Sequence, residues 1–246
     1  MKVTICDERR QLGREAASEG AYWIKEAIKN NGEANVVFVT GKSQVMTLFY
    51  LTLEDISWDK VNVFHLDEFV SIPKDSLASS YSFLNEYFLS KIGKVKSYTP
   101  IDSDEAKVEE TIKALNDTMK EHPLDVAFIC IGENGHLAFN DPPADFTTDE
   151  AYKVVVLDTK CRMQQVGEGW FETIDDVPEK AISMMPKEIM KAEHIVTVAP
   201  HSVKAKAIYD TITHSVSPDV PATLLKTHPD WNLFIDDDSA AMLFGK

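Results

Sequence analysis

Cysteine is scarce in this chain of 246 residues, with only Cys6, Cys130 and Cys161 present. Their spacing fits neither a disulfide framework nor a zinc site, so the sequence predicts reduced thiols and a cytoplasmic protein. The histidines and acidic residues also lack metal-ligand spacing such as His-x-x-x-His, and we expect no metal ion. A Gly-x-Ser-x-Gly elbow is missing as well, which argues against a serine hydrolase.

Basic residues are in the minority. Lys and Arg number 25 against 40 Asp and Glu, which gives a formal net charge of −15. Because no basic excess is available to displace counterions, we expect neither a nucleic acid nor an anionic membrane as a partner. No apolar run approaches membrane-spanning length, and the N-terminus has no signal-like apolar core, so we expect a soluble chain. A small phosphorylated ligand stays compatible with this charge, because it needs only local donors.

What the chain does have is 44% hydrophobic residues, in segments that alternate between strand-like and helix-like patterns. Apolar runs at residues 36–39, 61–66, 126–131 and 195–199 predict strands buried on both faces of a parallel sheet. Apolar residues at helical spacing predict helices at residues 10–30, 80–92, 104–120 and 182–193, whereas residues 158–176 fit a long loop or flap. We find no repeat or linker and expect one α/β domain over residues 1–246.

Four of the predicted strands are followed at once by polar side chains. The clusters are Thr40-Gly41-Lys42-Ser43, Asp67-Glu68, Asn134-Gly135-His136, and His201-Ser202 with Lys204 shortly after. Because the carboxyl ends of parallel strands meet at one edge of a sheet, we expect these clusters to converge. A glycine turn before a helix offers N–H groups to a phosphate, a partly buried carboxylate can act as a base, and an imidazole can transfer protons. This set predicts proton-transfer chemistry on a small phosphorylated carbonyl compound.

Each cluster also has a purely structural interpretation. Thr40 and Ser43 fit the cap of a helix equally well. Asp67 is compatible with a solvated turn carboxylate, and His136, with Asp141 five residues later to orient it, is compatible with a simple turn residue. The argument for a site therefore depends on the four clusters together.

Five motifs carry a resemblance to a known family. They are T-G-K-S-Q at residues 40–44, L-D-E-F-V-S-I-P-K at 66–74 with Ser80-Tyr81, G-E-N-G-H-L-A-F-N-D-P at 132–142, H-S-V-K-A-K-A at 201–207, and T-H-P-D-W-N-L-F-I-D-D-D at 227–238. In this order they resemble the glucosamine-6-phosphate deaminase/isomerase family over nearly the whole chain. The resemblance implies a Rossmann-like three-layer α/β/α fold with a mostly parallel sheet, a sugar 6-phosphate substrate and no cofactor.

The resemblance also implies a role for each matching residue. Asp67 matches the base that moves a proton between C2 and C1, and His136 matches the acid/base that opens the pyranose ring. Asp141 stands where the family has a glutamate that supports the histidine. Lys204 matches a ligand of the substrate phosphate. The phosphate loop of the family corresponds to Thr40, Gly41, Lys42 and Ser43.

Three features depart from the family pattern. Asn134 stands in the place of an aspartate, so one member of the ring-opening relay cannot ionise. Lys42 and Gln44 replace a small residue and a proline. Gln165 stands where an arginine of the flap is usual, with Arg162 nearby as a substitute. An Asn-Gly-His sequence also occurs in relatives assigned to galactosamine 6-phosphate, so both amino sugars stay open as substrates.

Two other functions are compatible with the sequence. A 6-phosphogluconolactonase is similar in fold, but its motifs read Asp-Glu-Arg and Gly-x-Asp-Gly-His-Thr, and neither Phe69 nor Leu137 fits them. The other is a non-catalytic sugar-phosphate sensor, for which Asn134 would mark lost chemistry. In all three cases the expected partner is a small sugar phosphate, and a homo-oligomer is left open.

Overall fold

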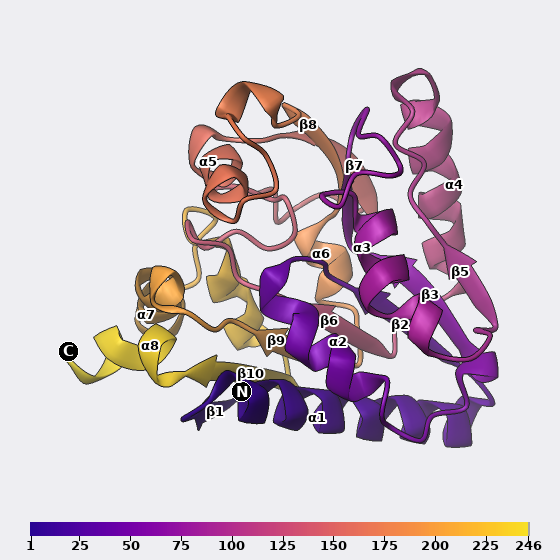
Figure 1. Ribbon diagram of the computed structural model, residues 1–246, viewed down its shortest axis with the longest axis horizontal. Helices are drawn as coiled ribbons and strands as arrows, with labels where there is room; N and C mark the ends of the chain where they lie inside the picture. The colour runs from indigo at the N-terminus through magenta and orange to yellow at the C-terminus, as the bar shows by residue number, and fades with distance from the viewer. Residues whose placement is uncertain (246) are drawn as a thin grey trace.

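A seven-stranded sheet forms the centre of the computed structural model, which describes residues 1–245 (Figure 1). Its strand order is β1-β10-β9-β6-β2-β3-β5, and every neighbouring pair is parallel. The strands are β1 (Lys2–Cys6), β2 (Ala34–Phe38), β3 (Val61–His65), β5 (Ser97–Thr99), β6 (Val126–Ile129), β9 (His194–Val198) and β10 (Trp231–Asp236). All residues of β2, β3 and β6 are buried, as expected for strands covered on both faces. The predicted parallel α/β sheet is confirmed.

Helices cover both faces of this sheet and give three layers. One face packs against α1 (Arg9–Asn31), α2 (Val45–Leu51) and α3 (Ser80–Tyr87), and the other against α4 (Val108–Glu121), α6 (Pro186–Ile189) and α7 (Ala205–Thr213). Helix α1 lies close to the sheet because small residues face it, and a Cβ at Gly20 would overlap the ring of Phe128. The short α8 (Asp237–Ala240) follows β10. This arrangement confirms the expected three-layer fold.

A smaller antiparallel sheet lies beside the main one, at the top of Figure 1. It consists of β4 (Asp67–Phe69), β8 (Lys180–Met184) and β7 (Tyr152–Val156) in the order β4-β8-β7. With α5 (Thr159–Gly167) it encloses a small hydrophobic core of its own. This core contains Phe69, Ile72, Phe139, Leu157, Cys161, Val177 and Ala181.

Two predictions from the sequence are wrong in this region. Residues 182–184 were expected to be helical but belong to β8, and only the four residues of α6 follow as a helix. Strand β8 pairs with β4 and β7, which are distant in sequence, and these pairings outweigh the local helical pattern. Residues 159–167, expected in a loop or flap, form α5, whose first turn is capped by the side chain of Asp158.

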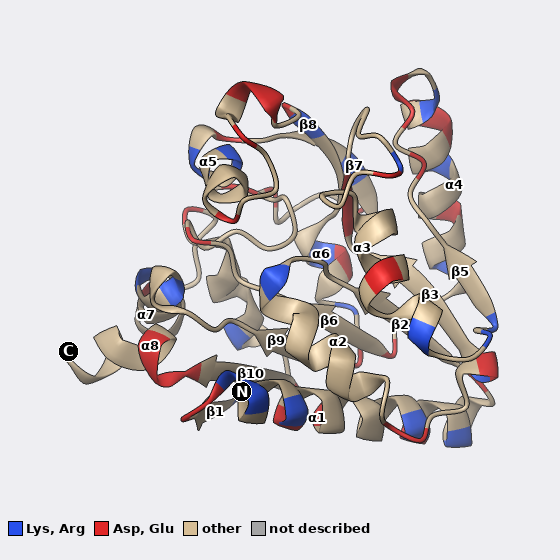
Figure 2. Ribbon diagram, in the orientation of Figure 1, with Lys and Arg blue, Asp and Glu red and all other residues tan. Residues whose placement is uncertain are grey.

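Charged side chains are spread over many elements. Figure 2 shows Lys and Arg interspersed with Asp and Glu along α1 and α4, which matches the absence of a basic excess in the composition. Separately, none of the helices within residues 1–245 has both the length and the apolar character that a membrane crossing needs.

Candidate active site

The first part of the site is the turn that follows β2. Gly41 has a φ of 116°, a conformation that glycine adopts without strain, and a short 3-10 turn (Lys42–Gln44) leads from it into α2. The hydroxyl of Thr40 lies 3.0 Å from that of Ser80, so this turn is joined to the start of α3. Thr40, Gly41 and Ser43 line a cavity at the carboxyl ends of the strands.

Asp67 lies in the same cavity, at the start of β4 just after β3. Its side chain is buried, and burial, reinforced by the neighbouring Glu68 carboxylate, raises its pKa to about 7 even though Ser80 Oγ lies 3.5 Å from Oδ1. A carboxyl group with this pKa can accept or release a proton near neutral pH, which suits a general base.

Glu68 has a different position from its neighbour. Its carboxylate accepts hydrogen bonds from Ser79 Oγ at 2.7 Å and from the backbone N–H groups of Ser80 and Tyr81, each at 3.1 Å. It therefore caps the N-terminus of α3 and satisfies donors that the helix itself cannot pair. By holding Ser80, Glu68 also helps to fix the surroundings of Asp67.

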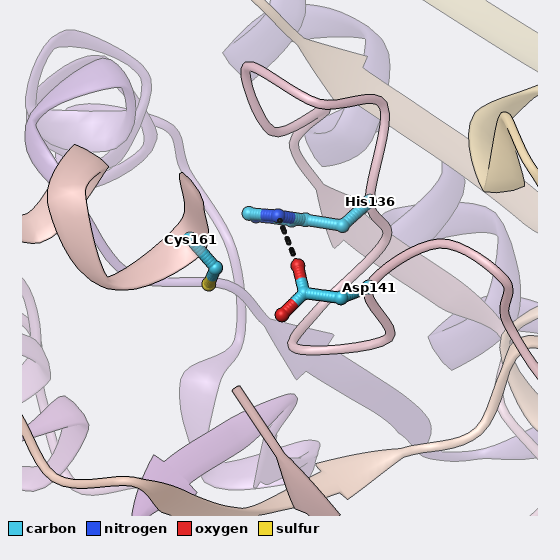
Figure 3. Close-up of side chains that lie close together, drawn as sticks. All are labelled: His136, Asp141 and Cys161. Atoms are coloured by element: carbon cyan, nitrogen blue, oxygen red, sulfur yellow. Dashed lines mark hydrogen bonds and ion pairs between the residues drawn. The ribbon is translucent and has the colours of Figure 1, made fainter. Parts of the chain in front are cut away.

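His136 lies in the tight turn after β6. A Cβ at Gly132 would overlap the imidazole, so glycine is required there for the ring to pack against the backbone. Nδ1 of His136 lies 3.1 Å from Oδ1 of Asp141, and the two side chains point toward each other (Figure 3). Burial by itself would raise the pKa of Asp141, but hydrogen bonds from His136, Asn134 and the backbone N–H of Asp158 lower it below its ordinary value. The pair is arranged for proton transfer by the imidazole.

Lys204 completes the cavity from the end of β9, in the 3-10 turn Ser202–Lys204. Only 5% of the residue is exposed, and it forms no ion pair with any residue among 1–245. A buried ammonium group without a carboxylate partner is costly unless an anion binds to it. The charge of Lys204 also acts on Cys130, but burial outweighs it and raises the pKa of the Cys130 thiol to about 12.

A segment from α5 onward covers the cavity. Gln164, Gln165, Glu168 and Trp170 line it from this side. Gln164 Nε2 donates to Glu168 Oε1 at 2.8 Å, and Trp170 Nε1 donates to Glu168 Oε2 at 3.0 Å. The Trp170 ring packs edge-on against Phe83 of α3. The flap expected over the site is thus partly helical and contacts the opposite wall.

The structure brings most of the predicted residues together. A single cavity is lined by Thr40, Gly41, Ser43, Asp67, His136, Gln165 and Lys204, and Asp141 and Asn134 support the histidine from behind. The sequence did not single out Gln164, Glu168 or Asp158. Of these, Asp158 carried a usable signal, because an aspartate just before a helix is a common N-cap.

Two predicted cations point elsewhere. The ammonium of Lys42 donates to the backbone carbonyl of Glu168 and lies 5.1 Å from the centre of the Trp170 ring. Arg162 donates to the carbonyl of Ile174 at 2.6 Å and lies 3.7 Å from the carboxylate of Glu179. Neither cation lines the cavity that contains Asp67, so the position of the expected flap arginine is left to the neutral Gln165.

One group of potential metal ligands exists within the described residues. The ligand atoms of His136, Asp141 and Cys161 all lie within 4.8 Å of one another (Figure 3). However, His136 and Asp141 are already hydrogen-bonded to each other, and burial raises the pKa of the Cys161 thiol far above its ordinary value. The geometry therefore suits a histidine–carboxylate pair beside a neutral thiol.

Known proteins were compared with the chain at the level of sequence and of fold. A glucosamine-6-phosphate deaminase of Oenococcus oeni is 31% identical over the full length of both chains, and one of Listeria monocytogenes is 32% identical over 93% of this chain and 96% of its own. The solved structure of a monomeric glucosamine-6-phosphate deaminase superposes with a TM-score of 0.88 at 26% identity, covering 98% of this chain and all of that one. The 6-phosphogluconolactonase of Trypanosoma brucei superposes with a TM-score of 0.80 at 16% identity and covers 98% of each chain, a likeness in fold alone.

The sequence of the chain also matches the model of a protein family. Residues 7–233 fit the sequence model described as glucosamine-6-phosphate isomerases/6-phosphogluconolactonase. This range includes every residue of the cavity described above. With the two relatives of over 30% identity matched almost end to end, this places the chain in the family of glucosamine-6-phosphate isomerases and 6-phosphogluconolactonases.

Proposed function

We propose that this enzyme converts a hexosamine 6-phosphate into a ketohexose 6-phosphate and ammonia, by aldose–ketose isomerisation coupled to deamination. The observation that carries the proposal is the carboxyl group of Asp67, whose pKa is raised to about 7 by burial in the cavity that also contains His136 and Lys204. The full-length similarity to glucosamine-6-phosphate deaminases supports the same reaction.

In this mechanism the phosphate binds at the turn after β2. Thr40, Gly41 and Ser43 surround it, and the ammonium of Lys204 supplies the positive charge, because charge-assisted hydrogen bonds to phosphate are strong. We leave Lys42 and Arg162 out of the phosphate site, since neither lines the cavity and their cationic ends contact the backbone carbonyls of Glu168 and Ile174.

His136 then opens the pyranose ring by moving the proton of the C1 hydroxyl to the ring oxygen, so that the bond between C1 and the ring oxygen breaks and the C1 aldehyde forms, while Asp141 holds the imidazole in place. In the open chain, Asp67 takes the proton from C2 and returns it to C1. The C1 aldehyde becomes a hydroxymethyl group and the C2 amine becomes an imine. One water molecule adds to this imine, and ammonia leaves, which gives the ketose.

A substrate panel tests the proposal. Ammonia release should be measured with glucosamine 6-phosphate and galactosamine 6-phosphate, beside hydrolysis of 6-phosphogluconolactone and binding of each sugar phosphate. We expect ammonia release from at least one hexosamine 6-phosphate and slower or no lactone hydrolysis. Lactone hydrolysis without ammonia release would favour the lactonase branch of the family, and binding without turnover would favour a sensor.

A further inference from the structure

The side chain of Asn134 lies between two carboxylates. Its Nδ2 donates to Oδ1 of Asp141 at 3.0 Å and reaches Oδ2 of Asp158 at 3.3 Å. Its Oδ1 accepts the backbone N–H of His136 at 3.1 Å. The amide therefore uses both of its donor hydrogens and its acceptor oxygen, which only a neutral amide can do in this place.

Asp158 connects this network to the flap. Its Oδ1 accepts the backbone N–H of Cys161 at 2.6 Å and so caps α5, while its own backbone N–H donates to Oδ2 of Asp141 at 2.9 Å. Asp158 thus contacts Asp141 through its main chain and Asn134 through its carboxylate. It holds the histidine turn and the covering helix in one arrangement.

We propose that Asp158 is a positioning residue for the His136–Asp141 pair, and that its carboxylate requires the neutral amide of Asn134. The role assigned to the pair rests on the proposed function, whereas the requirement for an amide follows from the contacts alone. A third carboxylate at position 134 would offer no donor to Asp141 or Asp158. Three like charges within hydrogen-bonding distance would repel one another.

Neighbouring charges do not relieve this repulsion. Asn134 also borders a second, larger cavity, which we call the outer cavity. Its basic residues are Lys42, Lys160, His201, Lys204 and Lys206. Besides Asp158, acidic groups border it as well, namely Glu133, Glu168, Asp210 and Asp219. Within residues 1–245, His136 is the only cation-forming group that pairs with Asp141 or Asp158. A carboxyl introduced at position 134 would therefore take up a proton to restore a donor.

The test compares Asn134→Asp, Asp158→Asn and the double variant with the parent chain. Asparagine is as good an N-cap as aspartate, so Asp158→Asn should keep α5, but its NH2 group would face Nδ2 of Asn134, and kcat should fall to a similar extent at pH 5.5 and pH 8. For Asn134→Asp, kcat relative to that of the parent should be about tenfold lower at pH 8 than at pH 5.5. The neighbouring like charges raise the pKa of the introduced carboxyl, so that it is protonated at the lower pH and ionised at the higher one. The double variant should recover most of the loss at pH 8, with KM little changed throughout.

Asp219 offers a matched control. It borders the same outer cavity, but its side chain is hydrogen-bonded to Ser217, so adding Asp219→Asn to Asn134→Asp should not rescue the activity. Melting temperature at both pH values gives a readout that needs no substrate. The deficit of Asn134→Asp should grow with rising pH and vanish in the double variant with Asp158→Asn.

Parental activity and stability of Asn134→Asp at pH 8 would overturn the inference, as would rescue by Asp219→Asn equal to rescue by Asp158→Asn. If the parent chain released no ammonia from any hexosamine 6-phosphate, the proposed function would fail. The melting comparison would then still decide whether Asp158 requires the amide.

Discussion

Nδ1 of His136 lies 3.1 Å from Oδ1 of Asp141, so the carboxylate engages one ring nitrogen and leaves Nε2 as the nitrogen that can act on a ligand. This relationship determines the tautomer of the neutral ring, because a carboxylate accepts the hydrogen of the nitrogen next to it. The imidazole also lines the same cavity as Asp67. Ring opening and proton transfer at C2 would thus have separate groups within one site.

Replacing the imidazole separates these two steps. His136→Gln should lower kcat with a cyclic hexosamine 6-phosphate by a factor on the order of 10² to 10⁴, the range expected for loss of a general acid/base. A substrate held in the open-chain form should recover part of that loss. Equal losses for cyclic and open-chain substrates would leave His136 with a binding or structural role. Turnover of both forms by the parent and the variant provides the comparison.

Asp67→Asn keeps the shape of the side chain and removes its basicity. We expect kcat to fall by a factor on the order of 10² to 10⁴ while binding of the sugar phosphate is largely kept. The partly exposed carboxylate of Asp102 is a control, since Asp102 does not line the cavity and Asp102→Asn should leave kcat unchanged. A near-normal kcat in Asp67→Asn would exclude it as the proton shuttle.

The pKa of Asp67 also predicts how activity and stability depend on pH. The base must be ionised, so kcat/KM should rise as the pH rises through about 7, and this limb should be missing in Asp67→Asn. Folding favours the protonated carboxyl, so its contribution to stability is complete below its ordinary pKa and is lost as the pH rises to about 7. At pH 8, Asp67→Asn should therefore have a higher melting temperature than the parent and a free energy of unfolding larger by on the order of 2–4 kcal/mol. At pH 4 the two proteins should be equally stable. A melting difference independent of pH would contradict this assignment.

Lys204→Ala tests the phosphate site. Binding of the phosphorylated sugar should weaken by roughly 1.5–3 kcal/mol, the value of a hydrogen bond to a charged group, and binding of the unphosphorylated sugar should hardly change. Lys42→Met is the matched control, because its ammonium contacts Glu168 and Trp170 of the flap. It should affect both sugars to the same extent. Calorimetry with both sugars measures the difference, and selective loss of the phosphorylated sugar in Lys42→Met alone would reverse the two assignments.

Much of the fold was predictable because its determinants are local. The strands β2, β3, β6 and β9 lie in short apolar runs, and each is followed by polar residues within a few positions. Parallel pairing places these strand ends at one edge, so the meeting of Gly41, Asp67, His136 and Lys204 follows from periodicity and topology. The sequence alone therefore determined the central strands of the sheet and the edge that carries the site, whereas the three layers were expected from the family resemblance.

Only the tertiary structure decided which side chains face the cavity and what holds them there. Lys42 lies in the predicted phosphate loop, yet its ammonium binds a carbonyl more than a hundred residues away, and β8 is a strand because of partners distant in sequence. The bridge from Asn134 to Asp158 likewise exists only because α5 begins beside the histidine turn. Such contacts depend on how separate segments pack, and a pattern read along one segment contains no information about the side chains that another segment brings to it.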